Sequence, residues 1–458
     1  MHTHRNFLIA STVLKVGFPP HFMDEGDKRN IGTRNPRVKR PYMKIAHIAP
    51  PWIRIPPKNY GGTEAVISNL VEEQVAEGHD VTLLAPGDAS TSAHLVSFFP
   101  QSLIDSGVPW QGHLKAYYHF YKSVEYIKEH DFDIVHMHLS ASSDMYLFPL
   151  TSSLTTPHVT TLHSRFPFDR VQSWTGDADT FFKEWFLSEP MVAISENARN
   201  DVPYALNFVG VVHHGLPMNF FKHAVKKPGD CFVWLGRFVP EKGAHLAIQA
   251  AKRAGVSLVL AGFVDKHIAE SIACFEEQIK PHIDGQQIKY VGPVNARQKI
   301  SLLSKARGLL NPIQWEEPFG MVMIEAMAVG CPVISFARGA ASEIVAHGKS
   351  GFLVDTIEEM IQCIPLLDEL DRFAVRDYAL QNFSVKAMSE QYLKVYKKVI
   401  TSTKLKSAMV KRAAKGLSIH QSPVVVPPSQ PTNVSKSAQT PYQVSLNAQV
   451  TREEQLKS

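Results

Sequence analysis

The chain has 458 residues, of which 44% are hydrophobic and 20% charged, which is typical of a globular protein with two or three domains. The formal net charge of +5 is small for this length and lies largely in basic runs near the ends, so we expect no nucleic-acid partner. The four cysteines form no Cys-x-x-Cys pair, which argues against a disulfide framework or a cysteine zinc site and favours a reducing, cytoplasmic location.

The two ends of the chain differ from its middle. Residues 1–42 precede a cleaner domain start at Met43, and residues 401–458 are rich in Ser, Gln, Pro, Lys and Thr, so we expect both segments to be disordered. The best apolar run, Phe7 to Phe18, is too short to span a membrane. We therefore expect no transmembrane segment, and a peripheral membrane contact stays open.

Residues 43–221 alternate between apolar strands and helical patterns, which predicts a first domain. A Gly61-Gly62 loop opens a helix that ends near Gly78, because apolar residues recur there at helical spacing. Ser195 follows the last predicted strand and is typical of a helix N-cap. The predicted strands cover residues 44–49, 81–85, 133–138, 158–162 and 191–194.

The pattern restarts after a basic linker at 222–230, so residues 231–384 are predicted to form a second domain. Its predicted helix covers 243–254, and its strands cover 231–235, 257–261, 289–291, 309–310 and 332–335. This alternation is typical of doubly wound parallel sheets, so we expect two Rossmann-like α/β domains facing across a cleft, with ligands at the carboxyl ends of the strands. A last helix is predicted at 385–400.

Two carboxylates flank the start of one predicted helix. Glu317 lies in a Pro-containing loop, the helix begins near Phe319 or Gly320, and Glu325 lies about a turn and a half further on. The free N–H groups and the positive dipole end of the helix suit a diphosphate, and Gly320 allows close approach to the backbone. Hydroxyls bound on either side would match a nucleotide sugar. The alternative for Glu325 is an ion pair between helices, which its apolar neighbours disfavour.

Two cations follow the first strand of the second domain. Gly236 and Arg237 come directly after strand 231–235, and Lys242 begins the next helix. Arginine offers a planar fork and lysine a point charge, a combination suited to two phosphates. The alternative is a surface ion pair with Glu241, but the clustering of both cations at a strand tip favours the phosphates.

Metal binding has two candidate motifs, and neither is complete. His136 and His138 point to the same side of a strand, with His163 nearby, but no carboxylate or cysteine completes a site. The Asp-x-Asp spacings at 131–133 and 177–179 fall at the amino end of a strand and in a polar loop without cations. We therefore expect no metal and no cofactor, with the two cations neutralising the diphosphate instead.

These residues belong to a series of motifs that resembles glycosyltransferase family 4, from Met43 to about Ile400. The motifs occur in the order of that family. They are Gly61 to Glu64, Asp133 to His138, Thr161 to Ser164, Ile194 to Asn197, His213 to Leu216, Gly236-Arg237, Glu241 to Gly243, Glu317 to Glu325, Ser342 to Val345 and Gly351 to Val354. The resemblance implies the GT-B fold, in which the last helix, 385–400, crosses back to the first domain.

The resemblance also implies a role for each candidate residue. Arg237 and Lys242 would hold the donor diphosphate as it leaves, Glu317 and His163 would reach the sugar, and Glu325 would bind the ribose. The predicted catalytic set is Glu317, His163, Arg237 and Lys242. The predicted donor-binding set is Gly61, Gly62, Gly236, Arg237, Lys242, Val291, Val294, Glu317, Phe319, Gly320 and Glu325.

The reaction that the resemblance implies is hexose transfer with retention of configuration. The donor would be a nucleotide sugar of the UDP-glucose or GDP-mannose type, and the acceptor a hydroxyl of a glycan, a lipid or a small molecule. In such a reaction the leaving phosphate itself accepts the proton of the acceptor. Two alternatives stay open, namely another GT-B enzyme such as a nucleotide-sugar epimerase or a phosphorylase, and a catalytically degenerate protein that binds a sugar or a partner.

Overall fold

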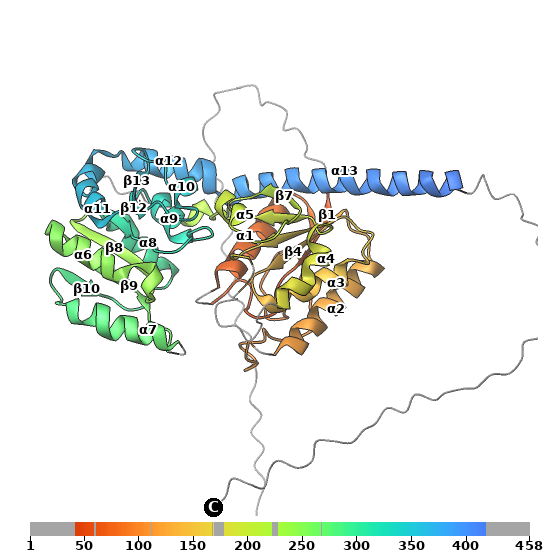
Figure 1. Ribbon diagram of the computed structural model, residues 1–458, viewed down its shortest axis with the longest axis horizontal. Helices are drawn as coiled ribbons and strands as arrows, with labels where there is room; N and C mark the ends of the chain where they lie inside the picture. The colour runs from red at the N-terminus through yellow and green to blue at the C-terminus, as the bar shows by residue number, and fades with distance from the viewer. Residues whose placement is uncertain are drawn as a thin grey trace, which may run out of the picture.

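The computed structural model describes residues 42–58, 61–110, 112–166, 168, 178–221, 228–266 and 268–417. Over these residues the chain forms two α/β units side by side, and the last helix runs from the second along the first (Figure 1). Each unit is built on one sheet of parallel strands, as the sequence predicts. Most of the predicted linker and of the segments predicted to be disordered lies outside the described residues.

The first unit holds a seven-stranded sheet in the order β3-β2-β1-β4-β5-β6-β7. Every residue of the central strand β4 is buried, as expected for a parallel sheet that is covered on both faces. The strands are β1 (Lys44–Ile48), β2 (Asp80–Leu84), β3 (His94–Val96), β4 (Ile134–Leu139), β5 (His158–Leu162), β6 (Met191–Ala193) and β7 (Phe208–Val211). The helices are α1 (Gly62–Ala76), α2 (His113–Glu129), α3 (Leu147–Thr151), α4 (Lys183–Phe186) and α5 (Glu196–Asn200).

Strands β3 and β7 were not predicted from the sequence. Both lie at an edge of the sheet, and neither contains a fully buried residue. β3 begins with His94 and has only two apolar residues, and Gly210 interrupts the apolar residues of β7, so both give a weaker signal than the other five strands.

The second unit holds a six-stranded sheet in the order β10-β9-β8-β11-β12-β13. Five of these strands fall where the sequence predicts them, and β13 is added at the edge. The strands are β8 (Cys231–Arg237), β9 (Ser257–Phe263), β10 (Ile288–Tyr290), β11 (Gly308–Asn311), β12 (Val333–Phe336) and β13 (Gly351–Val354). The helices are α6 (Ala244–Ala254), α7 (Ala269–Ala273), α8 (Ala296–Lys305), α9 (Met321–Ala328), α10 (Ala341–Ile344), α11 (Ile357–Cys363) and α12 (Arg372–Phe383).

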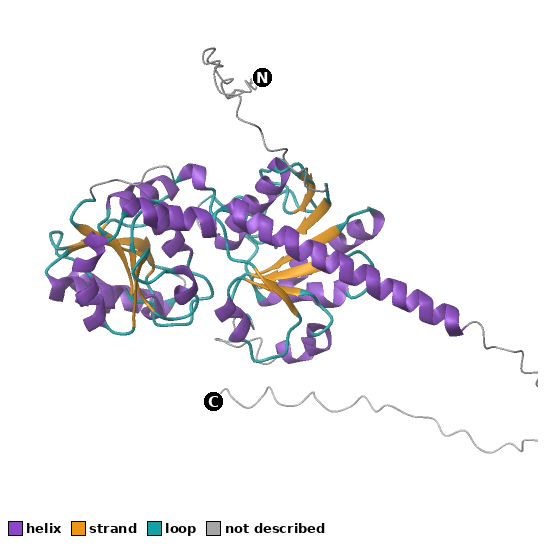
Figure 2. Cartoon of the chain, turned by 90° about the horizontal axis from the view of Figure 1, so that it is seen from above, coloured by secondary structure: helices purple, strands orange, loops and turns teal. Residues whose placement is uncertain are grey.

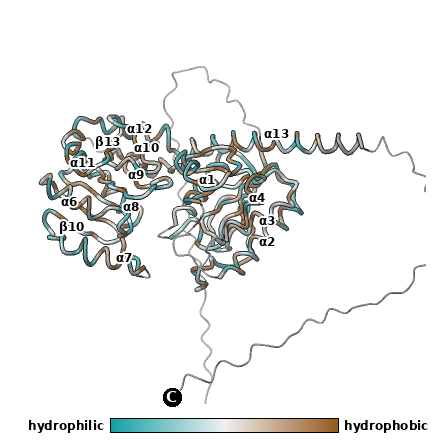
Figure 3. The backbone as a smooth tube through the Cα atoms, in the orientation of Figure 1, coloured by the Kyte–Doolittle hydropathy of each residue, from teal (hydrophilic) through white to brown (hydrophobic). Residues whose placement is uncertain are grey.

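Helix α13 (Val385–Leu417) leaves the second unit, crosses the first and projects beyond it (Figures 1 and 2). Apolar and polar residues alternate along it (Figure 3), and its apolar side chains, among them Tyr392 and Tyr396, join a core cluster with strands of the first sheet. The prediction that the helix ends at 400 and that disorder begins at 401 is wrong. Residues 401–415 contain no Pro or Gly and are rich in Lys and Ala, so their polar composition also suits an exposed helix.

No helix in the described ranges has the length and apolar character needed to cross a bilayer.

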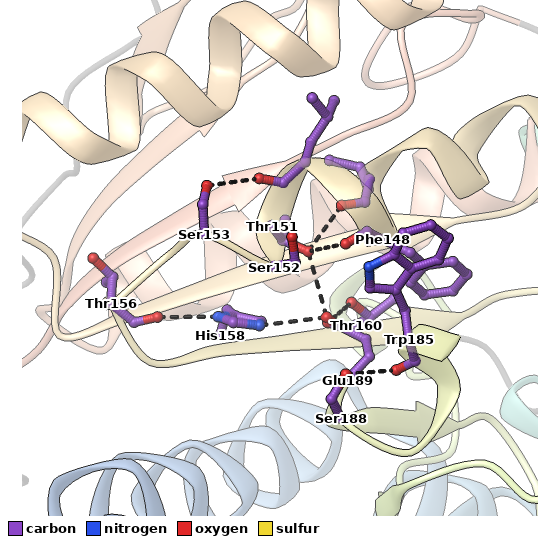
Figure 4. Close-up of polar contacts among 12 residues, drawn as sticks. Phe148, Thr151, Ser152, Ser153, Thr156, His158, Thr160, Trp185, Ser188 and Glu189 are labelled. Atoms are coloured by element: carbon purple, nitrogen blue, oxygen red, sulfur yellow. Dashed lines mark hydrogen bonds and ion pairs between the residues drawn. The ribbon is translucent and has the colours of Figure 1, made fainter. Parts of the chain in front are cut away.

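Near the amino end of β5, the buried carboxylate of Glu189 ties several segments of the first unit together (Figure 4). It accepts hydrogen bonds from Thr160 at 2.6 Å and Thr151 at 3.4 Å, and it lies 3.3 Å from His158 Nε2. Burial lowers the pKa of His158, but the hydrogen bond and charge of Glu189 outweigh this and leave the pKa raised. Ligands of parallel sheets bind at the carboxyl ends of the strands, so this network stabilises the fold away from the candidate site.

Candidate active site

Strand β8 ends in Gly236 and Arg237 at the carboxyl edge of the second sheet. Arg237 pairs in register with Phe263, the last residue of the neighbouring strand β9. The half-buried Arg237 side chain forms no hydrogen bond or ion pair with another described residue. The ion pair with Glu241 that the sequence left open is therefore not formed, and the guanidinium is available to an anionic ligand.

Lys242 closes the short turn between β8 and α6. Its ammonium forms an ion pair with Glu317, and the same carboxylate oxygen accepts a hydrogen bond from the Trp315 indole at 3.0 Å. The ammonium also lies 5.0 Å from the centroid of the Trp315 ring. The side chains of Lys242 and Glu317 keep 26% and 15% of their surface exposed, so a ligand can reach both. The fold thus brings together two of the predicted catalytic residues that lie 75 positions apart.

The turn at residues 338–340 packs against the backbone of Glu317. Ala340 donates its N–H to the Glu317 carbonyl at 2.8 Å, and Gly339 donates its N–H to the side chain of Glu316 at 2.7 Å. Gly339 has φ +58°, and a Cβ on it would lie 2.2 Å from the Glu317 nitrogen. Glu316 therefore holds the turn, and the turn sets the position of Glu317.

Helix α9 begins directly after Gly320, which adopts a left-handed φ of 91° that favours glycine. No side chain caps the first turn of this helix, whereas the Phe319 side chain is buried in the core. Glu325 forms an ion pair with Lys299 of α8. The helix–helix ion pair that the sequence disfavoured is therefore present, and Lys299 is a charged partner of the candidate site that the sequence analysis missed.

His163 lies just past β5 on the side of the first domain and is 8% exposed. Its Nε2 lies 2.9 Å from Nδ1 of His138, and its ring stacks on His214 with centroids 5.2 Å apart. His214 in turn contacts the Phe319 ring at 4.9 Å. Burial, and to a smaller extent the neighbouring His214, holds the pKa of His163 well below its usual value. His163 is thus a neutral imidazole, and the ring of His214 links it to Phe319 in the loop that carries Glu317.

The Glu317 loop and helix α10 both form polar contacts with the first domain. Ser195 Oγ donates to the Pro318 carbonyl at 2.7 Å, and Ser195 also caps α5, as the sequence predicts. Glu343 accepts the backbone N–H of Asn197 at 2.7 Å and lies 3.0 Å from His213 Nε2. Ser195, Asn197 and His213, which lie in motifs of the first domain, therefore contact the second domain.

The Gly61-Gly62 pair opens helix α1, and no side chain caps that helix. Glu64, in the first turn, is 4% exposed, and its Oε2 would lie 2.9 Å from a Cβ on Gly61. Burial raises the pKa of Glu64 to about 7, and the nearby charge of Asp144 adds to the shift. Glu64 belongs to the Gly61 to Glu64 motif, but its burial is visible only in the fold, so the sequence alone assigns it no role.

The raised pKa of Glu64 predicts how stability depends on pH. The folded state keeps this proton up to about pH 7, whereas the unfolded state loses it near pH 4.5, so the carboxyl makes folding less favourable as the pH rises through this window. We expect Glu64→Gln to stabilise the protein by up to about 3 kcal/mol above pH 7 and by much less below pH 4.5. Urea unfolding from pH 4 to pH 8 checks this. A difference between variant and wild type that does not grow with pH contradicts it.

The loop after β10 carries the predicted donor-binding residues Val291 and Val294. Val291 donates its N–H to the Leu260 carbonyl at 3.1 Å, and Gly262 donates its N–H to the Gly292 carbonyl at 3.1 Å. Val291 is 51% exposed. The loop therefore lies at the carboxyl edge of β9, where the sequence predicts contacts to the donor.

The first sheet contains a buried histidine cluster, in which His47 joins the predicted pair His136 and His138. His47, His136 and His138 each place a ring nitrogen within 4.8 Å of the other two, a spacing that could hold a metal ion. Both nitrogens of each ring, however, lie within hydrogen-bond distance of another polar group. Hydrogen bonds to described residues therefore explain why these three histidines lie together.

Among the residues that the structure describes, neither Asp-x-Asp spacing belongs to a cluster that could hold a metal ion. Asp133 Oδ2 accepts the backbone N–H of Lys44 at 2.8 Å, which gives it a structural contact at the amino end of the sheet. Asp177, in the second spacing, lies outside the described residues.

Comparison with known proteins yields two adjoining family matches. Residues 60–218 match the model described as Glycosyltransferase Family 4, and residues 217–362 match the model described as Glycosyl transferases group 1. The chain belongs to glycosyltransferase family 4. The two matches meet between β7 and β8, so they divide the chain in the same place as the two sheets do.

Similar proteins extend over the same part of the chain. The phosphatidyl-myo-inositol mannosyltransferase of Mycobacterium leprae is 24% identical over 390 residues, and that of Mycobacterium tuberculosis is 25% identical over 395 residues. Each match covers 79% of this chain and 98% of the relative. The family 4 glycosyltransferase is thus similar to mannosyltransferases over nearly their whole length.

Solved structures confirm the predicted GT-B fold. Sucrose-phosphate synthase from Thermosynechococcus elongatus superposes with a TM-score of 0.61 at 18% identity, over 79% of this chain and all of that one. HepE from Anabaena, in complex with UDP-glucose, superposes with a TM-score of 0.56 at 18% identity, over 78% of this chain and all of that one.

Proposed function

We propose that this family 4 glycosyltransferase is a retaining hexosyltransferase that uses a nucleotide-diphosphate sugar and needs no metal ion. The observation that carries the proposal is the cation pair on the β8–α6 connection. Arg237 has no charged partner among the described residues, and Lys242 contacts Glu317 beside the start of α9. Two cations and a helix N-terminus complement the charge of a diphosphate, and Glu317 can accept hydrogen bonds from sugar hydroxyls.

In the proposed mechanism the two cations act on the leaving group. Negative charge grows on the diphosphate as the bond to the sugar breaks, so Arg237 and Lys242 bind the transition state more strongly than the ground state. Glu317 shifts part of its interaction from Lys242 to a sugar hydroxyl. Glu325, oriented by Lys299, accepts hydrogen bonds from the ribose. The carboxylates thus position the donor while the cations lower the barrier.

Retention follows if the acceptor attacks from the side of the leaving phosphate. The ring contacts described for His163 are to His138 and His214, and neither of these groups is a carboxylate that could form a covalent sugar intermediate. The departing phosphate then takes the proton of the acceptor. Proton NMR of the product should show the anomeric configuration of the donor, and a product of the opposite configuration contradicts the proposal.

The donor that we test first follows from the similar proteins. Two of the relatives are mannosyltransferases, and HepE was solved with UDP-glucose, so GDP-mannose and UDP-glucose head the panel. Release of nucleoside diphosphate is measured for UDP-, GDP- and ADP-sugars without acceptor and with EDTA present. We expect slow hydrolysis of one donor, and loss of that hydrolysis in Glu325→Ala.

Two results of this panel contradict the proposal. Complete inhibition by EDTA that Mg²⁺ or Mn²⁺ reverses rules out metal independence. Absence of hydrolysis together with absence of thermal stabilisation by any nucleotide points to a degenerate binding protein.

We propose that the acceptor is a lipid-linked hydroxyl. We also propose that the end of α13 binds the anionic membrane surface at which this acceptor lies. The relatives are named for a phosphatidyl lipid, and α13 carries many cations and no acid after Glu390. These are Lys394, Lys397, Lys398, Lys404, Lys406, Lys411, Arg412 and Lys415. Lysines recur at positions 397, 404, 411 and 415, which share one side of a helix, while the exposed Leu405 and Met409 lie one turn apart. The helix projects past the first domain, so this segment is free to lie on a surface (Figure 2).

Vesicle binding tests the membrane contact. A lysine near an anionic surface contributes about 1 kcal/mol, so replacing Lys404, Lys406, Lys411 and Lys415 by glutamine should weaken binding to phosphatidylserine vesicles by about two to three orders of magnitude. A control variant with glutamine at four lysines of the second domain (Lys252, Lys280, Lys289 and Lys349) should bind like the wild type. Equal binding of both variants, or equal binding of the wild type to pure phosphatidylcholine, contradicts the proposal.

A further inference from the structure

A chain of hydrogen bonds crosses the first domain from α1 to His163. Gln74 Oε1 lies 2.8 Å from His47 Nε2, His47 Nδ1 lies 3.0 Å from His138 Nε2, and His138 Nδ1 lies 2.9 Å from His163 Nε2. The four residues come from α1, β1, β4 and the end of β5, and each is at least nine-tenths buried. The chain therefore connects α1 to the imidazole of His163, which the family resemblance implies reaches the donor sugar.

Each imidazole of the chain carries a single proton at neutral pH. Burial lowers the pKa of His47 to about 4 and holds the pKa values of His138 and His163 well below their usual range. A neutral imidazole donates a hydrogen bond from one ring nitrogen and accepts one at the other. A row of neutral imidazoles is therefore directional, since the position of the proton on the first ring fixes its position on all the others.

Gln74 sets the direction of the chain. Its Nε2 donates to the Tyr396 hydroxyl at 3.3 Å, so its oxygen faces His47 and can only accept. His47 must then carry its proton on Nε2, and the same holds in turn for His138 and His163. The Nδ1 of His163 is left as an unprotonated acceptor, and this buried nitrogen has no partner among the described residues.

The opposite direction is the less favourable one. If the Gln74 amide were reversed, all three imidazoles would carry their protons on Nδ1, and His163 would present a buried N–H without an acceptor. Unsatisfied buried donors are rare in proteins because they lose a hydrogen bond to water. When the Tyr396 hydroxyl accepts from Gln74 Nε2, it can donate its own proton to His136 Nδ1 at 2.7 Å, so the described orientation of the amide satisfies the hydroxyl as well as His163.

We propose that Gln74, oriented by Tyr396 of the crossing helix α13, acts as a positioning residue that keeps the proton of His163 on Nε2 and presents Nδ1 to a hydroxyl of the donor sugar. This inference rests on the proposed function for the sugar, but the proton position itself does not. The unprotonated Nδ1 of His163 can accept a hydrogen bond from a sugar hydroxyl, but it offers no hydrogen bond to a carboxylate. The site therefore selects donors with a neutral hydroxylated hexose over the corresponding hexuronate.

Nitrogen NMR of protein labelled with ¹⁵N-histidine tests the proton position directly, with His163→Gln used to assign the signals. We expect wild-type His163 to be protonated at Nε2. Tyr396→Phe and Gln74→Met should both lose this single tautomer and populate protonated Nδ1. The matched control is Tyr392→Phe, which removes a buried hydroxyl one turn away on the same helix that contacts Thr161 and not the chain, and it should keep the wild-type tautomer.

Two results overturn the inference. One is protonated Nδ1 on His163 in the wild type, and the other is an unchanged tautomer in both Gln74→Met and Tyr396→Phe. In the activity arm, Tyr396→Phe should lower kcat/KM for the hexose donor by about ten-fold relative to Tyr392→Phe, with unchanged affinity for the nucleoside diphosphate alone. If no nucleotide sugar is turned over, the proposed function fails, whereas the NMR result still decides the proton position.

Discussion

Replacement of Arg237 or Lys242 by methionine is expected to lower kcat/KM by about 10²- to 10³-fold, the loss that follows removal of one preorganised donor to a developing negative charge. The Arg237 side chain forms no hydrogen bond or ion pair with any described residue, so its replacement should leave the fold unchanged. Lys242 loses one partly exposed ion pair with Glu317, which contributes about 1 kcal/mol at most. Steady-state kinetics with the donor found in the panel, together with thermal unfolding, measures both effects.

The matched control lies on α6, the helix that follows Lys242. Arg253, in the last turn of α6, forms an exposed ion pair with Glu358 at 2.7 Å and is not part of the site. Arg253→Met should therefore keep the wild-type kcat/KM. Turnover near the wild-type rate in both Arg237→Met and Lys242→Met would show that these cations do not bind the diphosphate.

Gly339→Ala is expected to reduce turnover by about 10²-fold, because it displaces Glu317 without altering it chemically. The added Cβ would lie 2.2 Å from the Glu317 nitrogen and 2.4 Å from the Glu317 carbonyl oxygen, both of which are backbone atoms that cannot rotate away. The left-handed φ of +58° adds about 1–2 kcal/mol of strain for any residue with a Cβ. Kinetics and thermal unfolding should thus show a large loss of activity and a smaller loss of stability.

Gly348→Ala separates the clash from the strain. Gly348 has a similar φ of +73°, but a Cβ there would meet nothing within 4 Å. We expect this variant to lose about 1–2 kcal/mol of stability and to keep its turnover. Equal turnover in Gly339→Ala and Gly348→Ala would mean that the turn at 338–340 does not control the position of Glu317.

The sequence predicted the parts of the fold that have a local signature. Buried parallel strands such as β4 appear as short apolar runs, and glycine, serine and proline mark the turns between them. The edge strand β3 has only two apolar residues, and Gly210 interrupts the apolar residues of β7. The end of α13 was misplaced because Lys-rich residues without Pro or Gly suit both an exposed helix and a disordered tail.

The sequence predicted most residues of the candidate site, but it did not predict the contacts between them. Lys242 and Glu317 were found through motifs, yet their ion pair joins residues 75 positions apart. Lys299, which pairs with Glu325, has no motif of its own. Gln74 and Tyr396 interact across 322 positions, and only the packing of α13 on α1 brings them together. Such contacts depend on tertiary structure, so a single sequence carries no signal for them.

Nucleotide binding in the presence of EDTA tests the central claim most directly. Titration calorimetry compares UDP with UMP, or GDP with GMP, for the base found in the donor panel. If Arg237 and Lys242 hold the diphosphate without a metal, the diphosphate should bind at least about ten-fold more tightly than the monophosphate, and Arg237→Met should remove this difference. Equal binding of diphosphate and monophosphate, or a difference that appears only with Mg²⁺, would contradict the account.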